Sequence, residues 1–345
     1  MLFVVAAADA AGVATPRDDN RPTGPYDAVA GWLKPVDASR VTYPVSVFAE
    51  SPDRIFIGNK GSSPPPGNAH GFDPKYPGTR TDHLLLVVDR YGRLVEEWSQ
   101  WAQLFGSLHK VKINPYDAAK HVWVIDRASQ QVLEFTHDGK KLVRSIGERG
   151  VPGSDERHFG RPTDIAWLPD GTFFVSDGYD NTRVVKFAAD GRFLMQWGTR
   201  GTGPGQFNEP HGIAIDAQRR IYVADRLNAR IQVFDENGRF LSQWHGFDSP
   251  AAILVSQDQS VWVLDNGTGR VCKYDTAGRR LYSWGMSGDF PGGMADPHDF
   301  WVDGVGAVYI SNGHAHRVDK YVPASAANPG ELVGRPFVVS KAGVR

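Results

Sequence analysis

The stretch GQFNEPHGIAIDAQRRIYVADRLNARIQVFDENGRFLSQW, residues 205–244, contains the pattern that the rest of the chain repeats. Its runs GIAI, IYVAD and IQVF are short and rich in β-branched and aromatic residues, and polar turns separate them, which is typical of β-strands. The Asn237-Gly238 pair favours a tight hairpin turn between two strands. The stretch ends on Trp244. It therefore predicts one small antiparallel sheet of four strands.

Five further units follow the same plan. Each contains a run of alternating apolar residues that ends in Asp or Asn, which we call the marker residue. The markers are Asn59, Asp126, Asp177, Asp225, Asp265 and Asn312. Several units close on tryptophan, at Trp98, Trp197, Trp244 and Trp284. From Asp126 onward the markers recur about every 45 residues, the length of one propeller blade. The sequence therefore predicts an all-β fold, a six-bladed β-propeller. A stack of hairpins in a sandwich would not give such regular spacing.

The domain organisation follows from the repeats. Residues 41–345 are expected to form a single propeller, and residues 1–40 an irregular N-terminal lead-in. Residues 61–80 are rich in Pro and Gly and are expected to form a long loop over one face. Ring closure is expected to pair a terminal segment with the blade at the other end of the chain.

Composition excludes several classes of partner. The net charge is −1, so no polybasic surface suggests nucleic acid or anionic lipid. No apolar run is long enough for a transmembrane helix, and we expect no membrane partner. The apolar residues 1–14 lack a basic segment and contain Asp9, so they match a signal peptide poorly. The single cysteine, Cys272, excludes an intrachain disulfide framework. We expect a cytoplasmic protein in preference to a secreted or periplasmic one.

The residue 14 positions before each marker defines a slot near the start of a strand in each unit. In the second unit the turn NPYDAAKH is longer, and an insertion of three residues brings His109 into the slot. Around the ring the slot then contains Val45, His109, Thr163, His211, Ala251 and His298. Histidine thus occupies every second blade.

Alternate blades of a six-bladed ring lie about 120° apart, so slots on the innermost strands would direct three imidazoles at one point on the axis. Three His ligands with an open fourth position are typical of a catalytic Zn²⁺ site. Three unrelated channel-lining histidines are the alternative. Strict alternation favours the metal, and His109, His211 and His298 are the predicted ligands.

A resemblance to a known family adds to this interpretation. The segment GVPGSDERHFGRPTDIAWLPDGTFFVSDGYDNTRVVKF (150–187), the later GQFNEPHGIAI and ADRLNARIQVF, and DPHDFWVDGVGAVYISNGHAHRVDKY (296–321) resemble the NHL-repeat propeller of peptidyl-α-hydroxyglycine α-amidating lyase. The resemblance is dense over residues 105–245. It implies a catalytic zinc on the three histidines, Tyr179 of SDGY as catalytic tyrosine, and Arg226 of ADR as its partner. It also implies a structural calcium bound through Asp299 of PHD.

The sequence departs from the family pattern at three places. A first-blade arginine is replaced, with either Asn59 or Lys60 in its place. A methionine before the third histidine is replaced by Asp296, and two half-cystines by Gly160 and Asp180. These departures affect the expected substrate more than the expected metal.

The resemblance implies a lyase that cleaves the C–N bond of a carbinolamide, such as an N-substituted α-hydroxyglycine, to an amide and glyoxylate. Zn²⁺ would lower the pKa of the hydroxyl, and Tyr179 would take its proton. A metal-dependent hydrolase of the lactonase type and a non-catalytic NHL scaffold are the alternatives. The scaffold leaves the axial histidines without a purpose. The partner is expected to be a small-molecule or peptide-like hemiaminal, and the sequence carries no signal for its identity or for the oligomeric state.

Overall fold

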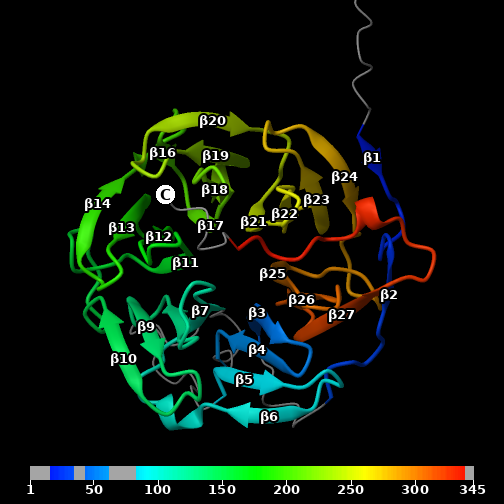
Figure 1. Ribbon diagram of the computed structural model, residues 1–345, viewed down its shortest axis with the longest axis horizontal. Coiled ribbons are helices and arrows are strands. Elements are labelled where there is room, and N and C mark those ends of the chain that lie inside the picture. The colour runs from blue at the N-terminus through cyan, green and yellow to red at the C-terminus, as the bar shows by residue number, and fades with distance from the viewer. Residues whose placement is uncertain (1–15, 35–42, 62–82, 339–345) are drawn as a thin grey trace, which may run out of the picture.

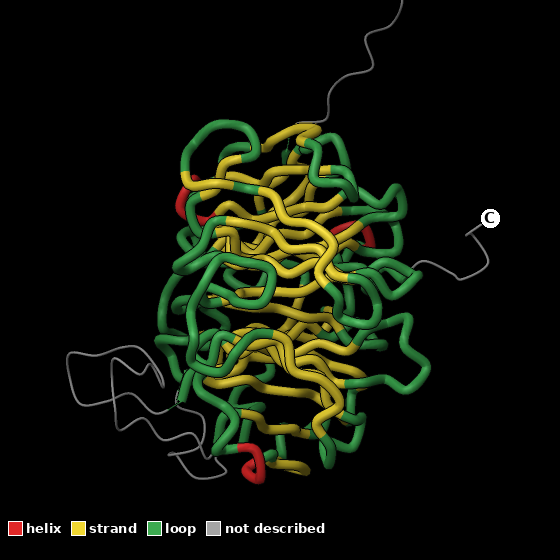
Figure 2. The backbone as a smooth tube through the Cα atoms, turned by 90° about the vertical axis from the view of Figure 1, so that its left-hand side faces the viewer, coloured by secondary structure: helices red, strands yellow, loops and turns green. Residues whose placement is uncertain are grey.

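A computed structural model describes residues 16–34, 43–61 and 83–338. In this part of the chain, six sheets, five of four strands and one of five, surround a central channel, which is the predicted six-bladed β-propeller (Figure 1). Figure 2 shows the strands running roughly along the channel axis, with loops gathered at the two faces. Most of the loop expected at 61–80 lies outside the described residues, so that loop stays a prediction. Residues 1–15 of the expected N-terminal lead-in also lie outside the described residues.

Each blade is an antiparallel meander whose first strand lies nearest the axis. Blade 1 consists of β3 (Pro44–Ser51), β4 (Arg54–Asn59), β5 (Leu85–Val88) and β6 (Leu94–Glu97). Blade 2 consists of β7 (Leu108–Ile113), β8 (Val122–Asp126), β9 (Gln131–Phe135) and β10 (Leu142–Ile146). Blade 3 consists of β11 (Pro162–Trp167), β12 (Phe173–Asp177), β13 (Arg183–Phe187) and β14 (Phe193–Trp197).

Blade 4 consists of β17 (Pro210–Ile215), β18 (Ile221–Asp225), β19 (Arg230–Phe234) and β20 (Phe240–Trp244). Blade 5 consists of β21 (Pro250–Val255), β22 (Val261–Asp265), β23 (Arg270–Tyr274) and β24 (Arg280–Trp284). Blade 6 consists of β25 (Pro297–Val302), β26 (Val308–Asn312), β27 (Arg317–Pro323) and β2 (Tyr26–Ala28). The small strands β15 (Thr199–Arg200) and β16 (Gln206–Phe207) pair with each other, and short 3₁₀ helices lie at Ser99–Trp101, Arg226–Asn228 and Pro329–Glu331.

The N-terminal segment closes the ring. β2 pairs antiparallel with β27 and forms the outer strand of blade 6, while β1 (Arg17–Asp18) pairs parallel with β24. The lead-in expected to be irregular over residues 1–40 therefore contains an outer strand of the propeller, and the boundary expected at residue 41 omits it. Closure of this kind ties the last blade to the beginning of the chain.

The apolar core lies between neighbouring blades. One cluster joins Phe174 and Val184 of blade 3 to Ile213 and Val223 of blade 4. Tryptophans that end the outer strands add to this packing. Gly139, in a hairpin turn of blade 2, lies against the indole ring of Trp98. A Cβ at Gly139 would lie 2.4 Å from that ring. Each sheet buries its two faces against the neighbouring sheets. The side chains that line the channel are therefore not needed to form the apolar core.

The innermost strands share one irregularity that positions the site. In all six, the register to the second strand shifts at the slot residue, as between Leu108 and Lys110 of β7, and between Pro297 and Asp299 of β25. A β-bulge of this kind re-aims side chains at the end of a strand. Among the described residues, no helix has the length and apolar character needed to cross a membrane.

Candidate metal centre

The three slot histidines meet on the axis of the propeller. His109, His211 and His298 are the second residues of β7, β17 and β25. Their ring centroids lie 4.7, 4.8 and 4.8 Å apart. Their nearest ligand nitrogens all lie within 4.8 Å of one another, and the three residues are at most 3% exposed. The arrangement has an approximate threefold symmetry because the three histidines come from alternate blades.

The intervening blades orient the imidazoles. Nδ1 of His109 lies 2.5 Å from the carbonyl oxygen of Thr163, and Nδ1 of His211 lies 2.6 Å from that of Ala251. Nδ1 of His298 lies 2.8 Å from the carbonyl oxygen of Val45. Each partner is the slot residue of the next blade. Since a carbonyl only accepts, Nδ1 donates the proton in all three rings, and the lone pairs are left on Nε2.

The protein offers these three Nε2 lone pairs at most one donor. Nε2 of His298 is buried and has no hydrogen-bond partner. Nε2 of His109 and Nε2 of His211 lie 3.1 and 3.3 Å from the hydroxyl of Tyr179, which has one proton to share between them. Leaving a buried acceptor unsatisfied costs about 1–3 kcal/mol, so at least two lone pairs remain unsatisfied by the protein.

The donor set fits a divalent metal of the zinc type. Burial lowers the pKa of all three imidazoles well below the usual value, with neighbouring cationic side chains acting in the same direction, so the rings are neutral. Neutral imidazole with a free Nε2 and a hydrogen-bonded Nδ1 is the form in which histidine binds Zn²⁺. The three Nε2 atoms are therefore the residues' available ligands.

Tyr179 follows β12 and lies beside the histidines, as its hydroxyl contacts show. Burial raises the pKa of Tyr179, and the positive charges of Arg226 and Arg127 oppose this rise. The protein's own charges alone do not favour the phenolate. A further positive charge at the histidines would act in the direction that the arginines do.

Arg226 is held at the rim by its neighbours. Its Nε donates to Ser249 Oγ at 3.0 Å, and an Nη donates to Glu209 Oε1 at 3.1 Å. It thus bridges blades 4 and 5, while its charge acts on Tyr179. Arg127 has the corresponding place in blade 2, is 5% exposed, and lies with its guanidinium carbon 5.2 Å from the Tyr179 ring centre.

The structure separates the two candidates for the missing first-blade arginine. The side chain of Asn59 turns outward and donates to the carbonyl of His83 at 3.1 Å. The Nζ of Lys60 lies 4.2 Å from the ring centre of Tyr43. Burial lowers the pKa of Lys60 to about 7, helped by Arg127 and Arg226 and opposed by Asp296. Lys60 is therefore the residue that shares the electrostatic environment of the arginines.

Asp296 replaces the expected methionine and adds negative charge to this environment. Its carboxylate accepts hydrogen bonds from Tyr43 and from Nδ2 of Asn266, the latter at 2.7 Å. Asp296 has a positive φ of 54°, and Glu209, at the same place relative to its histidine, has 65°. Left-handed backbone at non-glycine residues is uncommon and is found often at functional sites.

A positional signal could have revealed these groups in the sequence. The residue directly after the marker is polar or charged in four blades: Lys60, Arg127, Arg226 and Asn266. Arg127 follows the marker Asp126, and its guanidinium lies over the ring of Tyr179. The side chains around the histidines are therefore better identified by their position directly after a marker residue than by their residue type.

The two positions where the family has half-cystines also lie together. The backbone N–H of Asp180 donates to the carbonyl of Gly160 at 3.0 Å. A Cβ at Gly160 would lie 2.5 Å from the side chain of Asn181. A backbone hydrogen bond therefore joins the loop before β11 to the loop that carries Tyr179.

Asp299 does not lie among the histidine nitrogens. Its Oδ2 accepts from Ser46 Oγ and from the backbone N–H of Val47, both at 3.1 Å, and its Oδ1 contacts the ammonium of Lys110. A lysine thus already provides the positive charge at the carboxylate expected to bind calcium. The residues present do not fit a calcium ion at this position.

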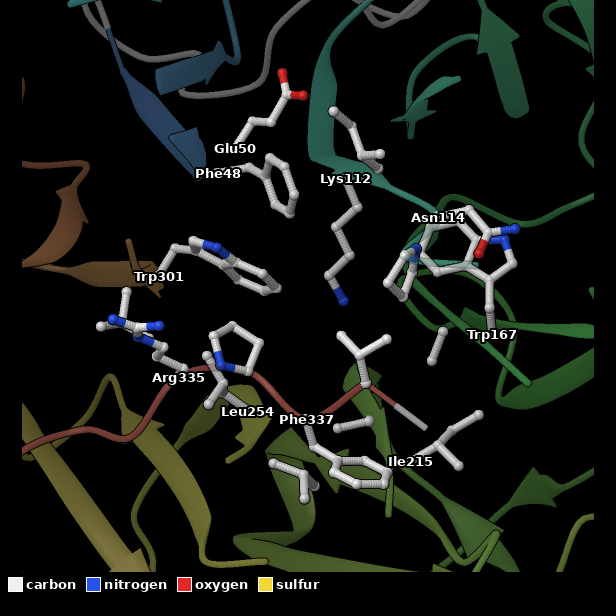
Figure 3. A pocket seen from close by; sticks show the side chains of 18 of the residues that line it. Phe48, Glu50, Lys112, Asn114, Trp167, Ile215, Leu254, Trp301, Arg335 and Phe337 are labelled. Carbon is white, nitrogen blue, oxygen red and sulfur yellow. The ribbon is translucent and has the colours of Figure 1, made fainter. Parts of the chain in front are cut away.

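The opposite end of the channel has a different character. A pocket of about 430 Å³ is formed there by the far ends of the innermost strands and by residues 335–338. Trp301, Phe337 and Trp167 surround it, and the side chain of Lys112 points into it (Figure 3). The histidines and Tyr179 do not line this pocket.

A second set of metal-type side chains lies elsewhere in blade 2. Asp117, His121 and Glu134 have ligand atoms within 4.8 Å of one another. His121 pairs with Asp117 at 2.7 Å, and Arg144 pairs with Glu134 at 3.2 Å. These contacts account for the cluster without a metal.

Comparisons with known proteins agree with the fold. A family model described as a 6-bladed beta-propeller matches residues 152–242. The chain is 36% identical over 203 residues to mouse peptidyl-glycine alpha-amidating monooxygenase, covering 54% of this chain and 20% of the mouse protein. It is 32% identical over 192 residues to peptidyl-alpha-hydroxyglycine alpha-amidating lyase 1 of Drosophila melanogaster, covering 52% of this chain and 34% of that protein.

Human NHL repeat-containing protein 3 is 31% identical over 183 residues, covering 49% of this chain and 51% of the human protein. The matches thus span at most about half of these relatives. Among solved structures, virginiamycin B lyase from Staphylococcus aureus has a TM-score of 0.53 at 13% identity, covering 88% of this chain and 89% of that one, which shows the fold alone. The chain is a six-bladed β-propeller that resembles, over about half of its length, the amidating lyases and the NHL repeat-containing proteins.

Proposed function

We propose that the protein is a zinc-dependent lyase that cleaves the C–N bond of an N-substituted α-hydroxyglycine-like carbinolamide. The products are an amide and an aldehyde such as glyoxylate. The observation that carries the proposal is the convergence of three neutral imidazoles, two of which contact the hydroxyl of Tyr179 through Nε2. The names of the relatives, which include an amidating lyase, support the same reaction class.

His109, His211 and His298 would hold the metal through Nε2, the nitrogen that the protein leaves free. When bound, Zn²⁺ supplies a Lewis acid that lowers the pKa of a substrate hydroxyl. A scaffold without catalysis would not need three buried imidazole lone pairs, because each one lowers stability when it stays unsatisfied.

Tyr179 is the proposed general base, since its Oη lies at the imidazole nitrogens where the hydroxyl would be held. Tyr179 Oη takes the hydroxyl proton, the O–H electrons form the C=O bond of the aldehyde, and the C–N electron pair leaves with nitrogen. The proton then passes from Tyr179 Oη to that nitrogen, which completes the amide. Atoms and charge balance without an oxidant or a second substrate.

Charged side chains would orient the substrate. The Lys60 ammonium is the proposed partner of the substrate carboxylate, since the residue lies with the arginines rather than outward as Asn59 does. Arg226, fixed by Glu209 and Ser249, keeps its charge near Tyr179 and favours the phenolate.

Glyoxylate release from an N-acyl-α-hydroxyglycine tests the proposal. Protein with one equivalent of zinc should release glyoxylate and the acyl amide in equal amounts, and the His211→Ala variant should not. A lactone offered to the same preparation serves as the comparison substrate. Lactone opening without any aldehyde release from the carbinolamide would replace the lyase with a hydrolase.

A further inference from the structure

A second set of polar side chains joins the innermost strands directly after the histidines. Four of the residues that follow a slot residue contact one another, and we call them the axial layer: Ser46, Lys110, Asp164 and Asp299. The bulge at the slot breaks the alternation of the strand, so that Lys110 reaches Asp164 of blade 3 and Asp299 of blade 6. The layer lies between the histidines and the pocket at the other end of the channel.

The charged members of this layer bind one another. Lys110 contacts Asp299 Oδ1, and its Nζ lies 3.6 Å from Asp164 Oδ2. Lys112 lies two residues after Lys110 in β7. Its Nζ is 2.6 Å from Asp164 Oδ1 and 2.9 Å from the carbonyl oxygen of Ile165. Two cations and two anions are thus paired across three blades.

All four groups are buried. Lys110 and Lys112 are 6% and 7% exposed, and Asp164 and Asp299 are each 1% exposed. The remaining oxygen positions of the aspartates are occupied by protein donors, such as the N–H of Ile213 at 3.2 Å from Asp164 Oδ2. Buried charges are tolerated when they are paired and hydrogen-bonded in this way.

A calcium ion would require a different environment. Ca²⁺ takes six to eight oxygen ligands at about 2.3–2.6 Å, and it would have to displace the ammonium from Asp299 Oδ1. A bound calcium ion would also lie beside the two ammonium groups of Lys110 and Lys112. Only the carboxylates of Asp164 and Asp299 would then balance the charges of all three cations. The ammonium and a calcium ion therefore exclude each other at this position.

We infer that Lys110 takes the place of a structural cation on the axis, so that the propeller is tied together across blades 2, 3 and 6 by its own charges and does not require calcium. The inference is independent of the proposed reaction, because none of these groups contacts Tyr179 or an Nε2 atom in the described contacts.

Calcium content and thermal stability test it on the whole protein. Zinc-saturated protein, equilibrated with millimolar CaCl₂ and then desalted, should contain less than a tenth of an equivalent of calcium. Its melting temperature should be the same with and without CaCl₂. Stoichiometric calcium after desalting, or a melting temperature that rises by 5 °C or more with CaCl₂, would overturn the inference without any variant.

The Lys110→Ser variant provides the reciprocal test. Removing the ammonium leaves two buried carboxylates short of a cation, and the melting temperature should fall by about 5 °C. CaCl₂ should restore much of this loss, because Asp164, Asp299 and Ser46 then face the vacated space with oxygen atoms. An unchanged melting temperature, or a loss that calcium does not restore, contradicts the assignment.

Lys273→Ser is the matched control. Lys273 is 8% exposed and its Nζ lies 3.5 Å from Asp258 and 2.9 Å from the carbonyl oxygen of Gly330, away from the axis. Its replacement should lower stability without creating any response to calcium. If the Lys110→Ser variant does not fold, the calcium content of the unmodified protein still decides the question.

Discussion

Lys60 gives a pH dependence that can be worked out from the structure. Burial and the charges of Arg127 and Arg226 lower its pKa to about 7, with Asp296 and Glu209 opposing. Lysine is a cation below its pKa, so Lys60 is about 90% charged at pH 6 and about 10% charged at pH 8. If the ammonium binds the substrate carboxylate, kcat/KM for a carboxylate substrate should fall about tenfold over this range through Lys60 alone.

The assay compares two substrates so that other titrations cancel. N-acyl-α-hydroxyglycine and its uncharged carboxamide analogue undergo the same C–N cleavage and use the same Tyr179. The ratio of their kcat/KM values, measured from pH 5.5 to 8.5, should fall about tenfold between pH 6 and pH 8 with a midpoint near 7. The sign follows from the lowered pKa: charge, and with it preference for the carboxylate, is lost as pH rises.

Two variants check the assignment to Lys60. Lys60→Arg should keep the preference for carboxylate at all these pH values, because guanidinium stays charged. Lys60→Met should lower the ratio at pH 6 by about 10- to 100-fold, the worth of one hydrogen bond to a charged group. A ratio that is independent of pH in the unmodified protein, or equal in the Met variant, refutes the role of Lys60.

Three further predictions concern the base, its partner and the fold. Tyr179→Phe should keep zinc, because its hydroxyl is not needed for the three Nε2 contacts, while kcat falls about 10²–10⁴-fold; full lyase activity would show that another group takes the proton. Arg226→Ala should reduce turnover and move the rise of kcat to higher pH, because the phenolate of Tyr179 loses a cationic neighbour; an unchanged pH profile counts against this role. Gly139→Val should lower the free energy of unfolding by about 1–3 kcal/mol in a denaturant titration, because a Cβ at this positive φ meets the Trp98 ring; an unchanged midpoint would contradict the packing argument.

The repeats made the fold predictable, because each unit carries its own strand pattern and turn. The six markers end strands in the structure, as do Trp197, Trp244 and Trp284, while Trp98 directly follows β6. β2 was missed because its three residues, Tyr26–Ala28, show no alternation of their own, and the strand forms only by pairing with β27. Pairing between the ends of a chain leaves no local pattern to read.

The site was predictable where one position repeats around the ring, and less so where local backbone changes direction. The histidine slot follows from counting back from the markers, with one insertion of three residues in the second unit. Lys110 and Asp164 were not predicted as channel residues, because strict alternation turns the residue after the slot away from the axis. The bulge at the slot reverses this expectation. Asn59 and Lys60 could not be distinguished, since adjacent residues at a strand end point in directions that only the loop determines.

The account's central claim is that one metal ion is bound by His109, His211 and His298 through Nε2. Elemental analysis of the purified protein at neutral pH, beside the three single His→Ala variants and the triple variant, tests it most directly, with circular dichroism and melting curves to establish that each variant is folded. The account predicts about one equivalent of zinc in the unmodified protein and in a His121→Ala control, and steeply reduced zinc in each slot variant. Near-stoichiometric zinc in a folded triple variant would contradict it.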